Sequence, residues 1–283
     1  MSASDLRAAT AVARIAQGET SIYRADLPDA WSFRTPSGGV LMTTALRAMT
    51  AELDDPAFHL VSATTTFVRS MPSGPQRIEV VTLRRGNAAC QLRARAQVEG
   101  DELGLEVAAT FARFREGPDA HGREMPEVPP PEACEDASPR GRYLGRTLPF
   151  FDNVELRLAI GAPTWRDDWE AGEARTAYWY RYLVPQEQGG ELDPLALPPI
   201  IDTMPSSLTR RLGPKHARFF APSLDLTVHF LDPSRGGWLL VDVTCPRARG
   251  GYASAHADVW DQEGHLLAFA TQTMMLRKRR RLG

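Results

Sequence analysis

Two polar side chains, Asp202 and Gln272, stand where a second copy of the same segment carries apolar residues. The sequence repeats itself at an offset of 161 residues, and at that offset Asp202 falls opposite Leu41 and Gln272 falls opposite Phe111. We therefore expect both to occupy interior positions, where an unpaired carboxylate is costly unless it has a partner or a purpose. A carboxylate can accept a proton from water while an amide holds that water, so the pair indicates general-base chemistry.

Each of these two residues also has a simpler explanation, which the sequence leaves open. Aspartate is common at the start of a helix, where its side chain caps the exposed backbone amides, and Asp202 lies near a predicted helix start. Gln272 lies in a predicted strand and could face solvent there.

The repeat rests on a long register without a gap. Residues 62–110 align with residues 223–271, with identical residues at many of the matched positions. The pattern Ala-x-Ala-x-Val, at residues 94–98 and again at 255–259, places three small apolar side chains on one face of a strand in each copy. Chance matching of common residues is the alternative, but the length of the register favours two half-domains.

The rest of the chain supplies the elements that would position these groups. In each half a mostly apolar helix precedes a run of strands, and the first helix starts at the glycine pair Gly38 and Gly39, where another chain segment can approach closely. The predicted helices cover residues 4–16, 40–53 and 198–212. The predicted strands cover residues 20–27, 61–69, 77–84, 88–99, 105–115, 154–160, 174–184, 224–231, 238–243, 252–260 and 266–277.

These elements indicate how the chain is organised. We expect residues 1–115 and 143–283 to form two repeats, joined by a linker at residues 116–142 that is rich in Gly, Pro, Asp and Glu. One central helix wrapped by a curved antiparallel sheet is the hotdog arrangement, and two such units in tandem would join their sheets. The predicted fold class is therefore α+β, a double hotdog with the polar candidates in its C-terminal repeat.

The composition excludes several classes of protein. A net charge of −2 argues against binding nucleic acid through a general positive field, and we expect the basic run at residues 278–281 to be a solvated tail. The three cysteines fit neither a metal cluster nor a disulfide framework, as in a reducing compartment. No apolar run is long enough to cross a membrane and no secretory signal is evident, so we expect a cytoplasmic protein without membrane insertion.

Four patches, in this order and spacing, resemble the type II acyl-CoA thioesterase family, the double-hotdog thioesterases. They are the Gly38-Gly39 pair before an apolar helix and the segments 67–74, 223–230 and 270–277. The last segment carries a Gln a few residues before an Arg, as the family does. The resemblance covers most of the chain, although the linker is not diagnostic.

The resemblance implies a catalytic trio in the C-terminal half. Carried over residue by residue, the acid is Asp202, the hydroxyl is Ser223 and the amide is Gln272. The family more often has Thr at the hydroxyl position, so Ser223 is a departure, and a turn-proximal serine is its simpler explanation. Thr227 is the rival hydroxyl and a candidate substrate contact if the register differs.

The chemistry that this family performs needs no metal and no cofactor, because coenzyme A is part of the substrate. Asp202 would activate a water molecule, and the turn at Gly38 and Gly39 would bind substrate by supplying a backbone N–H to the oxyanion from the other half. Pro199, at the equivalent place in the second half, has no N–H to offer. The Gly-x-Ser-x-Gly elbow of α/β-hydrolases is missing from the sequence.

The sequence therefore predicts a cytoplasmic hydrolase of fatty acyl-CoA, active in fatty acid metabolism and assembled as a homo-oligomer. A catalytically silent acyl-CoA-binding or scaffold protein of the same fold is the first alternative. A hotdog enoyl-CoA hydratase is the second, because Asp225 and His229 lie four residues apart on one strand face. Acyl chain length, carrier and pathway are not readable from the sequence.

Overall fold

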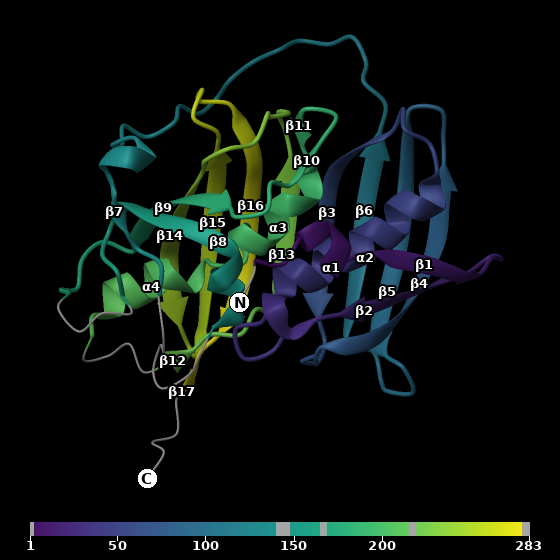
Figure 1. The fold of residues 1–283 in the computed structure, drawn as a ribbon, viewed down its shortest axis with the longest axis horizontal. Coiled ribbons are helices and arrows are strands. Elements are labelled where there is room, and N and C mark those ends of the chain that lie inside the picture. Colours follow the sequence, from purple (N-terminus) through teal and green to yellow (C-terminus); the bar gives the residue numbers. More distant parts are fainter. Residues whose placement is uncertain (1–2, 140–147, 165–168, 215–218, 279–283) are drawn as a thin grey trace.

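The structure is a computed structural model that describes residues 3–139, 148–164, 169–214 and 219–278. The predicted basic tail at residues 278–281 and the end of the predicted linker lie mostly outside these residues. Figure 1 shows the two halves side by side, the first in purple to blue and the second in green to yellow. None of the helices in the described residues combines the length and the hydropathy needed to cross a membrane.

The first half consists of one long helix and a set of antiparallel strands. Its helical segments are α1 (Leu6–Ala9), the 3-10 turn η1 (Asp29–Trp31) and α2 (Gly38–Leu53). Its strands are β1 (Val12–Ala16), β2 (Ser21–Leu27), β3 (His59–Phe67), β4 (Gly74–Arg85), β5 (Ala89–Val98) and β6 (Leu105–Ala112).

The second half repeats this plan with a shorter, interrupted helix. Its helical segments are η2 (Pro131–Ala133), η3 (Pro149–Asn153), η4 (Pro194–Ala196), α3 (Leu197–Ile201) and α4 (Pro205–Leu212). Its longer strands are β8 (Val154–Ile160), β9 (Arg175–Tyr182), β13 (Asp225–Phe230), β14 (Leu239–Arg249), β15 (Tyr252–Trp260) and β16 (Leu266–Met275). Short strands are β7 (Glu135–Asp136), β10 (Glu187–Gln188), β11 (Glu191–Leu192), β12 (Phe219–Phe220) and β17 (Arg277–Lys278).

Within the described residues the two halves share one 13-stranded sheet, in the order β1-β2-β4-β5-β6-β3-β13-β16-β15-β14-β9-β8-β7. The seam is the antiparallel pair β3 and β13, in which Thr65 lies opposite Leu226. Leu226 is also the counterpart of Thr65 at the 161-residue offset, so the repeat is related by a pseudo-twofold axis at this pair. The sheet wraps around α2, α3 and α4 (Figure 1), which confirms the predicted α+β double hotdog.

One continuous apolar core spans both halves, because α2 packs against α3 across the seam. Two polar contacts fix this packing. The Thr43 hydroxyl donates to the carbonyl oxygen of Leu195 at 2.8 Å, and the Arg47 guanidinium lies 2.9 Å from the Asp193 carboxylate. Asp193 is only 9% exposed, so its ion pair with Arg47 holds the segment before α3 against the middle of α2.

The second-half helix differs from the prediction of one helix over residues 198–212. Asp202 follows α3 directly, and three residues separate α3 from α4, which starts at Pro205. Proline has no N–H and its ring clashes with the carbonyl four residues earlier, here that of Ile201, so an unbroken helix is disfavoured. Asp202 is therefore at the end of one short helix and not at the start of a long one.

The N-terminal segment also differs from the prediction of a helix over residues 4–16. Helix α1 is only four residues long, and its Leu6 and Ala9 are buried. The chain then forms β1, an edge strand paired with β2. The β-branched residues Val12 and Ile15 favour a strand. The edge of β2 offers backbone hydrogen-bonding partners to this segment, and the periodicity of the segment itself contains no sign of that distant partner.

Part of the predicted linker packs on the outer face of the second half. The indole N–H of Trp179 donates to the carbonyl oxygen of Pro129 at 3.0 Å, and Met125 packs against the same small apolar cluster. The guanidinium of Arg123 forms a hydrogen bond with Asp258 and lies 4.5 Å from the centre of the Phe269 ring.

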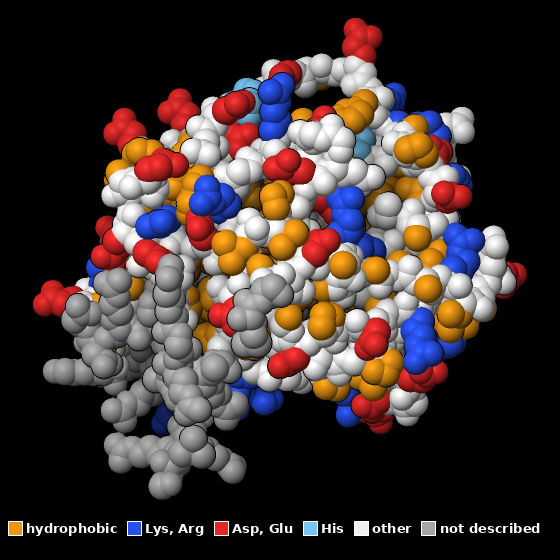
Figure 2. Space-filling model, in the orientation of Figure 1, with side chains coloured by type: hydrophobic (Ala, Val, Ile, Leu, Met, Phe, Trp, Pro, Cys, Tyr) orange, Lys and Arg blue, Asp and Glu red, His pale blue; other side chains and the backbone are white. Residues whose placement is uncertain are grey.

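On the face shown in Figure 2, acidic and basic side chains are interspersed among apolar ones, in keeping with the net charge of −2.

Candidate active site

The Asp202 side chain lies at the junction of the two halves. Asp202 is the C-cap residue of α3, and its carboxylate reaches the first turn of α2 in the first half. Only 8% of its surface is exposed. Because it does not begin its own helix, the simple explanation of a local N-cap is wrong.

Four donors surround this carboxylate, two on each oxygen. The Ser223 hydroxyl (2.9 Å) and the Gln272 side-chain amide (2.6 Å) donate to Oδ1. The Gly39 backbone N–H (3.0 Å) and the Ser37 hydroxyl (3.2 Å) donate to Oδ2. A carboxylate offers about four acceptor positions in all, so these four hydrogen bonds occupy all of them.

Burial and hydrogen bonding act on this carboxyl in opposite directions. Burial raises the pKa of Asp202 above its ordinary value, because the charged form is removed from water. The hydrogen bonds from Gly39, Ser223, Gln272 and Ser37 lower the pKa, but they offset the burial only in part. A raised pKa makes the ionised carboxylate a stronger proton acceptor than an exposed aspartate.

The start of α2 is built around Asp202. Ser37 occupies the N-cap position, yet its side chain makes no cap hydrogen bond, and the Gly39 N–H is taken by Asp202 instead. The positive end of the helix dipole favours a carboxylate there. A Cβ on Gly39 would lie 2.1 Å from the carbonyl oxygen of Pro198, so only glycine permits this close crossing of α2 and α3.

Gly38 lies directly beside the carboxylate. It is partly exposed, and a Cβ at this position would lie 3.0 Å from Asp202 Oδ2 and 2.7 Å from Cζ of Phe67. Within the described residues, the backbone N–H of Gly38 makes no hydrogen bond. A helix-start amide without a partner therefore lies beside the base, whereas the amide of Gly39 is already engaged by it.

Gln272 faces the interior of the sheet and not the solvent. It lies on β16, pairs with Ala255 of β15 and is only 1% exposed. Its Nε2 donates to Asp202, while its Oε1 is buried with no hydrogen-bond partner among the described residues. A buried acceptor without a partner is unusual, and its hydrogen-bonding capacity is unused within the described residues.

The structure separates the two hydroxyl candidates. Ser223 lies just before β13, bridges to Met274 and donates to Asp202. Thr227 is on the opposite face of β13 from the buried Leu226, and its hydroxyl lies 3.0 Å from that of Thr64. Thr227 is therefore not the hydroxyl that binds Asp202, because successive strand residues alternate between the two faces. Its contact with the substrate stays a prediction.

The carboxylate–imidazole pair of the hydratase alternative also lies on the outer face. His229 is exposed, and Asp225 accepts the backbone N–H of Thr273 at 2.8 Å. Leu226 and Val228, which alternate with them, are fully buried. Neither member of the pair faces the helices and Asp202.

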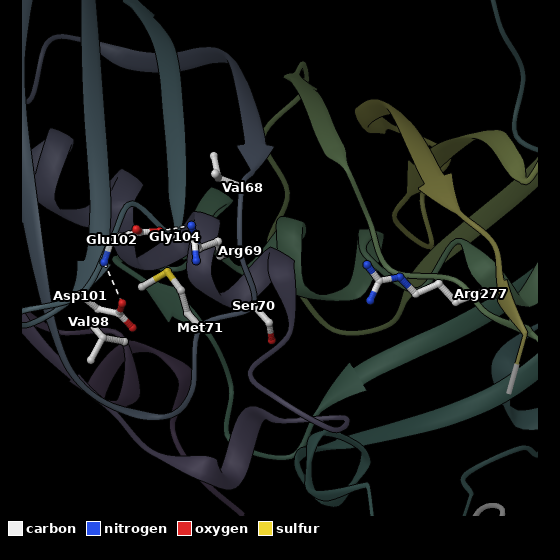
Figure 3. Close-up of a pocket in the computed structure, with 9 residues that line it drawn as sticks. All are labelled: Val68, Arg69, Ser70, Met71, Val98, Asp101, Glu102, Gly104 and Arg277. Carbon is white, nitrogen blue, oxygen red and sulfur yellow. Dashed lines mark hydrogen bonds and ion pairs between the residues drawn. The ribbon is translucent and has the colours of Figure 1, made fainter. Parts of the chain in front are cut away.

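A hollow of about 370 Å³ lies at the seam near the end of β3, and its lining includes none of the groups that surround Asp202. Figure 3 shows Arg69 and Glu102 joined on the wall from the first half, with Arg277 standing apart on the side of the second half. Phe67, which directly precedes this lining, also flanks Gly38.

The structure thus brings together Asp202, Ser223 and Gln272 as the sequence predicted, and it adds Ser37. Gly39, which the sequence predicted as an oxyanion donor, instead gives its N–H to Asp202. A serine directly before a glycine-led helix is a typical N-cap signal, so the sequence could have drawn attention to Ser37. Its contact with a carboxylate 165 positions away could not be read from that signal.

Two sequence profiles of one family match the chain. The profile of an acyl-CoA thioesterase N-terminal domain matches residues 27–114, and that of an acyl-CoA thioesterase C-terminal domain matches residues 130–276. Among proteins of curated function, none matches the chain in sequence.

Solved structures of the same size share the fold over nearly the whole chain. A hotdog-fold protein of unknown function from Alicyclobacillus acidocaldarius is 22% identical, with a TM-score of 0.82 over 97% of this chain and 98% of that one. The acyl-CoA thioesterase II TesB2 of Mycobacterium marinum is 23% identical, with a TM-score of 0.73 over the same shares. A TesB protein of Mycobacterium avium subspecies paratuberculosis is 21% identical, with a TM-score of 0.74 over 96% and 98%.

Proposed function

The chain belongs to the acyl-CoA thioesterase family, and we propose that it hydrolyses an acyl-CoA to the free acid and coenzyme A. The observation that carries the proposal is the buried Asp202 carboxylate, held by the Ser223 hydroxyl and the Gln272 amide in one half only. An apolar pair, Leu41 and Phe111, takes these places at the repeat offset in the other half. One site per chain therefore carries the chemistry.

The reaction starts with a water molecule placed between Asp202 and the thioester carbonyl. Asp202 takes a proton as the water oxygen bonds to the carbonyl carbon, and the carbonyl π electrons move to its oxygen. The backbone N–H of Gly38, at the positive end of α2, donates to this oxyanion. The oxyanion then re-forms the carbonyl and the carbon–sulfur bond breaks, so that the thiolate leaves and takes the proton held by Asp202.

Several finer features belong to the same proposal. The acyl group is a fatty acyl chain, the base needs no metal or cofactor, and the protein works in the cytoplasm as a homo-oligomer. The apolar surroundings of α2 and α3 support an apolar acyl group. The family resemblance supports the oligomer.

The catalytically silent alternative has one observation in its favour. All the acceptor positions of Asp202 are filled by the protein itself, which is also what a purely structural carboxylate would require. The partly exposed Gly38 amide and the unpaired Oε1 of Gln272 favour the enzyme, because a structural site would have satisfied both.

The experiment is a measurement of free-thiol release by the wild-type protein from acyl-CoAs ranging from acetyl to palmitoyl. Turnover that peaks at one chain length supports the proposal and defines the acyl specificity. Tight binding of acyl-CoA with no thiol release on any substrate would replace the enzyme with the silent binding protein. Hydration of an enoyl-CoA without thiol release would favour the hydratase.

A further inference from the structure

The oxygen atoms of Asp202 leave no position for the water molecule that this carboxylate must activate. Each oxygen already accepts two hydrogen bonds from the protein. A water molecule that is to give Asp202 its proton must first form a hydrogen bond to it, so one of the four donors has to yield. The identity of this donor follows from the geometry.

Three of the four donors are poorly placed to yield. The Gly39 N–H is part of the backbone, and its segment is pressed against Pro198. The Gln272 amide makes the shortest of the four bonds, at 2.6 Å. Ser223 donates at 2.9 Å to Oδ1, the same oxygen as Gln272, and not to Oδ2, which lies beside Gly38.

Ser37 differs from the other three. Its hydroxyl makes the longest bond, 3.2 Å, and, like that of Ser223, it can turn about a single side-chain bond. It binds Oδ2, the oxygen that a Cβ on Gly38 would approach to 3.0 Å. The Oδ2 atom therefore lies beside Gly38, whose amide would bind the thioester oxygen.

We propose that Ser37 is a positioning residue whose hydroxyl occupies the place of the hydrolytic water on Asp202 Oδ2 and rotates away when that water binds. The inference rests on the proposed thioesterase function. After rotation the hydroxyl remains within the first turn of α2, at the N-cap position where a serine oxygen accepts hydrogen bonds. The water then donates to Oδ2 and lies beside the Gly38 amide.

The consequence for Asp202 is a defined change in its acid–base behaviour. All four groups that touch the carboxylate are uncharged, and the Ser37 hydroxyl is one of the hydrogen bonds that lower its pKa. Removing this donor disfavours the ionised form, so the pKa of Asp202 moves up. Removing it also frees the acceptor position for water, so the chemical step no longer competes with the hydroxyl.

The test is the pH profile of kcat and kcat/KM for wild type, Ser37→Ala and Ser223→Ala with the best acyl-CoA substrate. For Ser37→Ala we expect the acid limb of kcat/KM, which reports the free enzyme, to move up by roughly 0.5–1 pH unit, since a hydrogen bond to a charged group is worth about that much after water replaces it. The acid limb of kcat should move less, because in the reactive complex of wild type the water has already displaced the hydroxyl. We expect the plateau kcat of Ser37→Ala to exceed that of wild type, because the water no longer competes with the hydroxyl. Ser223→Ala, which removes a holding group, lowers its plateau kcat.

Two controls keep these outcomes distinct. Ser37→Gly also lacks the hydroxyl but is a better N-cap residue than alanine, so it must reproduce the shift of the acid limb if the hydroxyl is responsible. Thermal unfolding of each variant reports whether α2 is intact. A wild-type protein that releases no thiol would refute the proposed function and this inference together. An active wild type whose Ser37 variants show an unmoved acid limb of kcat/KM, or a plateau kcat no higher than the wild-type value, would refute only the role of Ser37.

Discussion

The Asp202 carboxylate accepts the backbone N–H of Gly39 at 3.0 Å, so a side chain of the second half caps the first turn of the helix in the first half. The base is therefore positioned by a helix that belongs to the other repeat. Because Ser223 and Gln272 hold the second oxygen of the same carboxylate from the second half, the site exists only where the two repeats meet. Neither half alone would assemble it.

Gly39→Ala is expected to destabilise the protein severely. The added Cβ would lie 2.1 Å from the carbonyl oxygen of Pro198, which is backbone and cannot rotate away. Forcing α2 and α3 apart in a close-packed core should lower the free energy of unfolding by about 3 kcal/mol or more. Urea denaturation measures this loss, and a variant as stable as wild type would contradict the close crossing of the two helices.

Gly38→Ala is the matched control, for which we expect a small loss of stability and a large loss of activity. Its Cβ would meet the edge of the Phe67 ring at 2.7 Å and Asp202 Oδ2 at 3.0 Å, and a ring at the end of a side chain can move. We expect a loss of unfolding free energy of only about 1 kcal/mol. We expect kcat to fall at least tenfold, because the methyl group fills the approach to the base. Full activity in this variant would mean that substrate reaches Asp202 from elsewhere.

The pH dependence of stability should carry the signature of Asp202. Its pKa in the folded protein is raised above that of the unfolded chain, so the protonated form is favoured by folding. This contribution is fully present below the unfolded-state pKa of about 4 and is lost as the pH rises through the folded-state pKa. Asp202→Asn cannot titrate. The unfolding free energy of the variant minus that of wild type should therefore increase from pH 4 towards neutrality, and a constant difference would contradict a raised pKa.

Much of the fold and the site was predictable from the sequence, because the repeat preserves packing. The 161-residue offset set Thr65 against Leu226, the residues at the pseudo-twofold seam. The same offset placed Asp202 and Gln272 at positions with apolar counterparts, and both are buried. Residues at matching interior positions of a repeat must fit the same surroundings. A polar residue opposite an apolar one therefore indicates a role that only one half performs.

The remaining errors arise where a contact depends on distant segments. Helical periodicity continues through residues 4–16, but residues 12–16 form β1, because this segment pairs with the edge of β2. The sequence predicts Ser223 as the hydroxyl but leaves Thr227 as a rival, because the register of the strand depends on the burial of Leu226. Ser37 was missed because its partner is 165 positions away, beyond any local signal.

Gln272→Leu tests the amide that holds the base. The substitution keeps the approximate shape but removes the donor that lies 2.6 Å from Asp202 and the unpaired Oε1. Since loss of one preorganised donor at a reacting centre costs roughly 10²–10³ in rate, kcat should fall by about that factor. The free energy of unfolding should change less, because the substitution also removes a buried oxygen that has no hydrogen-bond partner among the described residues, and this gain offsets part of the cost of the lost hydrogen bond. Steady-state kinetics with urea denaturation would show both effects, and unchanged kcat would exclude Gln272 from the site.

Ser223→Ala and Thr227→Ala form a matched pair of hydroxyl deletions on neighbouring positions. Ser223 donates to Asp202, whereas Thr227 meets Thr64 on the outer face of the sheet. We expect Ser223→Ala to lower kcat at least tenfold and Thr227→Ala to leave kcat within twofold of wild type. Thiol-release assays on both variants decide between the two positions, and the reverse pattern would show that the register of β13 is wrong.

The most direct test of Asp202 as the base is kcat for coenzyme A release by wild type and Asp202→Asn, measured with the same acyl-CoA at a pH above the acid limb. General-base catalysis contributes roughly 10²–10⁴ in rate, so we expect kcat to fall by about that factor. Thermal unfolding of the variant should remain cooperative, which shows that the site is altered and the fold is intact. Turnover by Asp202→Asn within tenfold of the wild-type value would contradict the account, because the water would then be activated by another group.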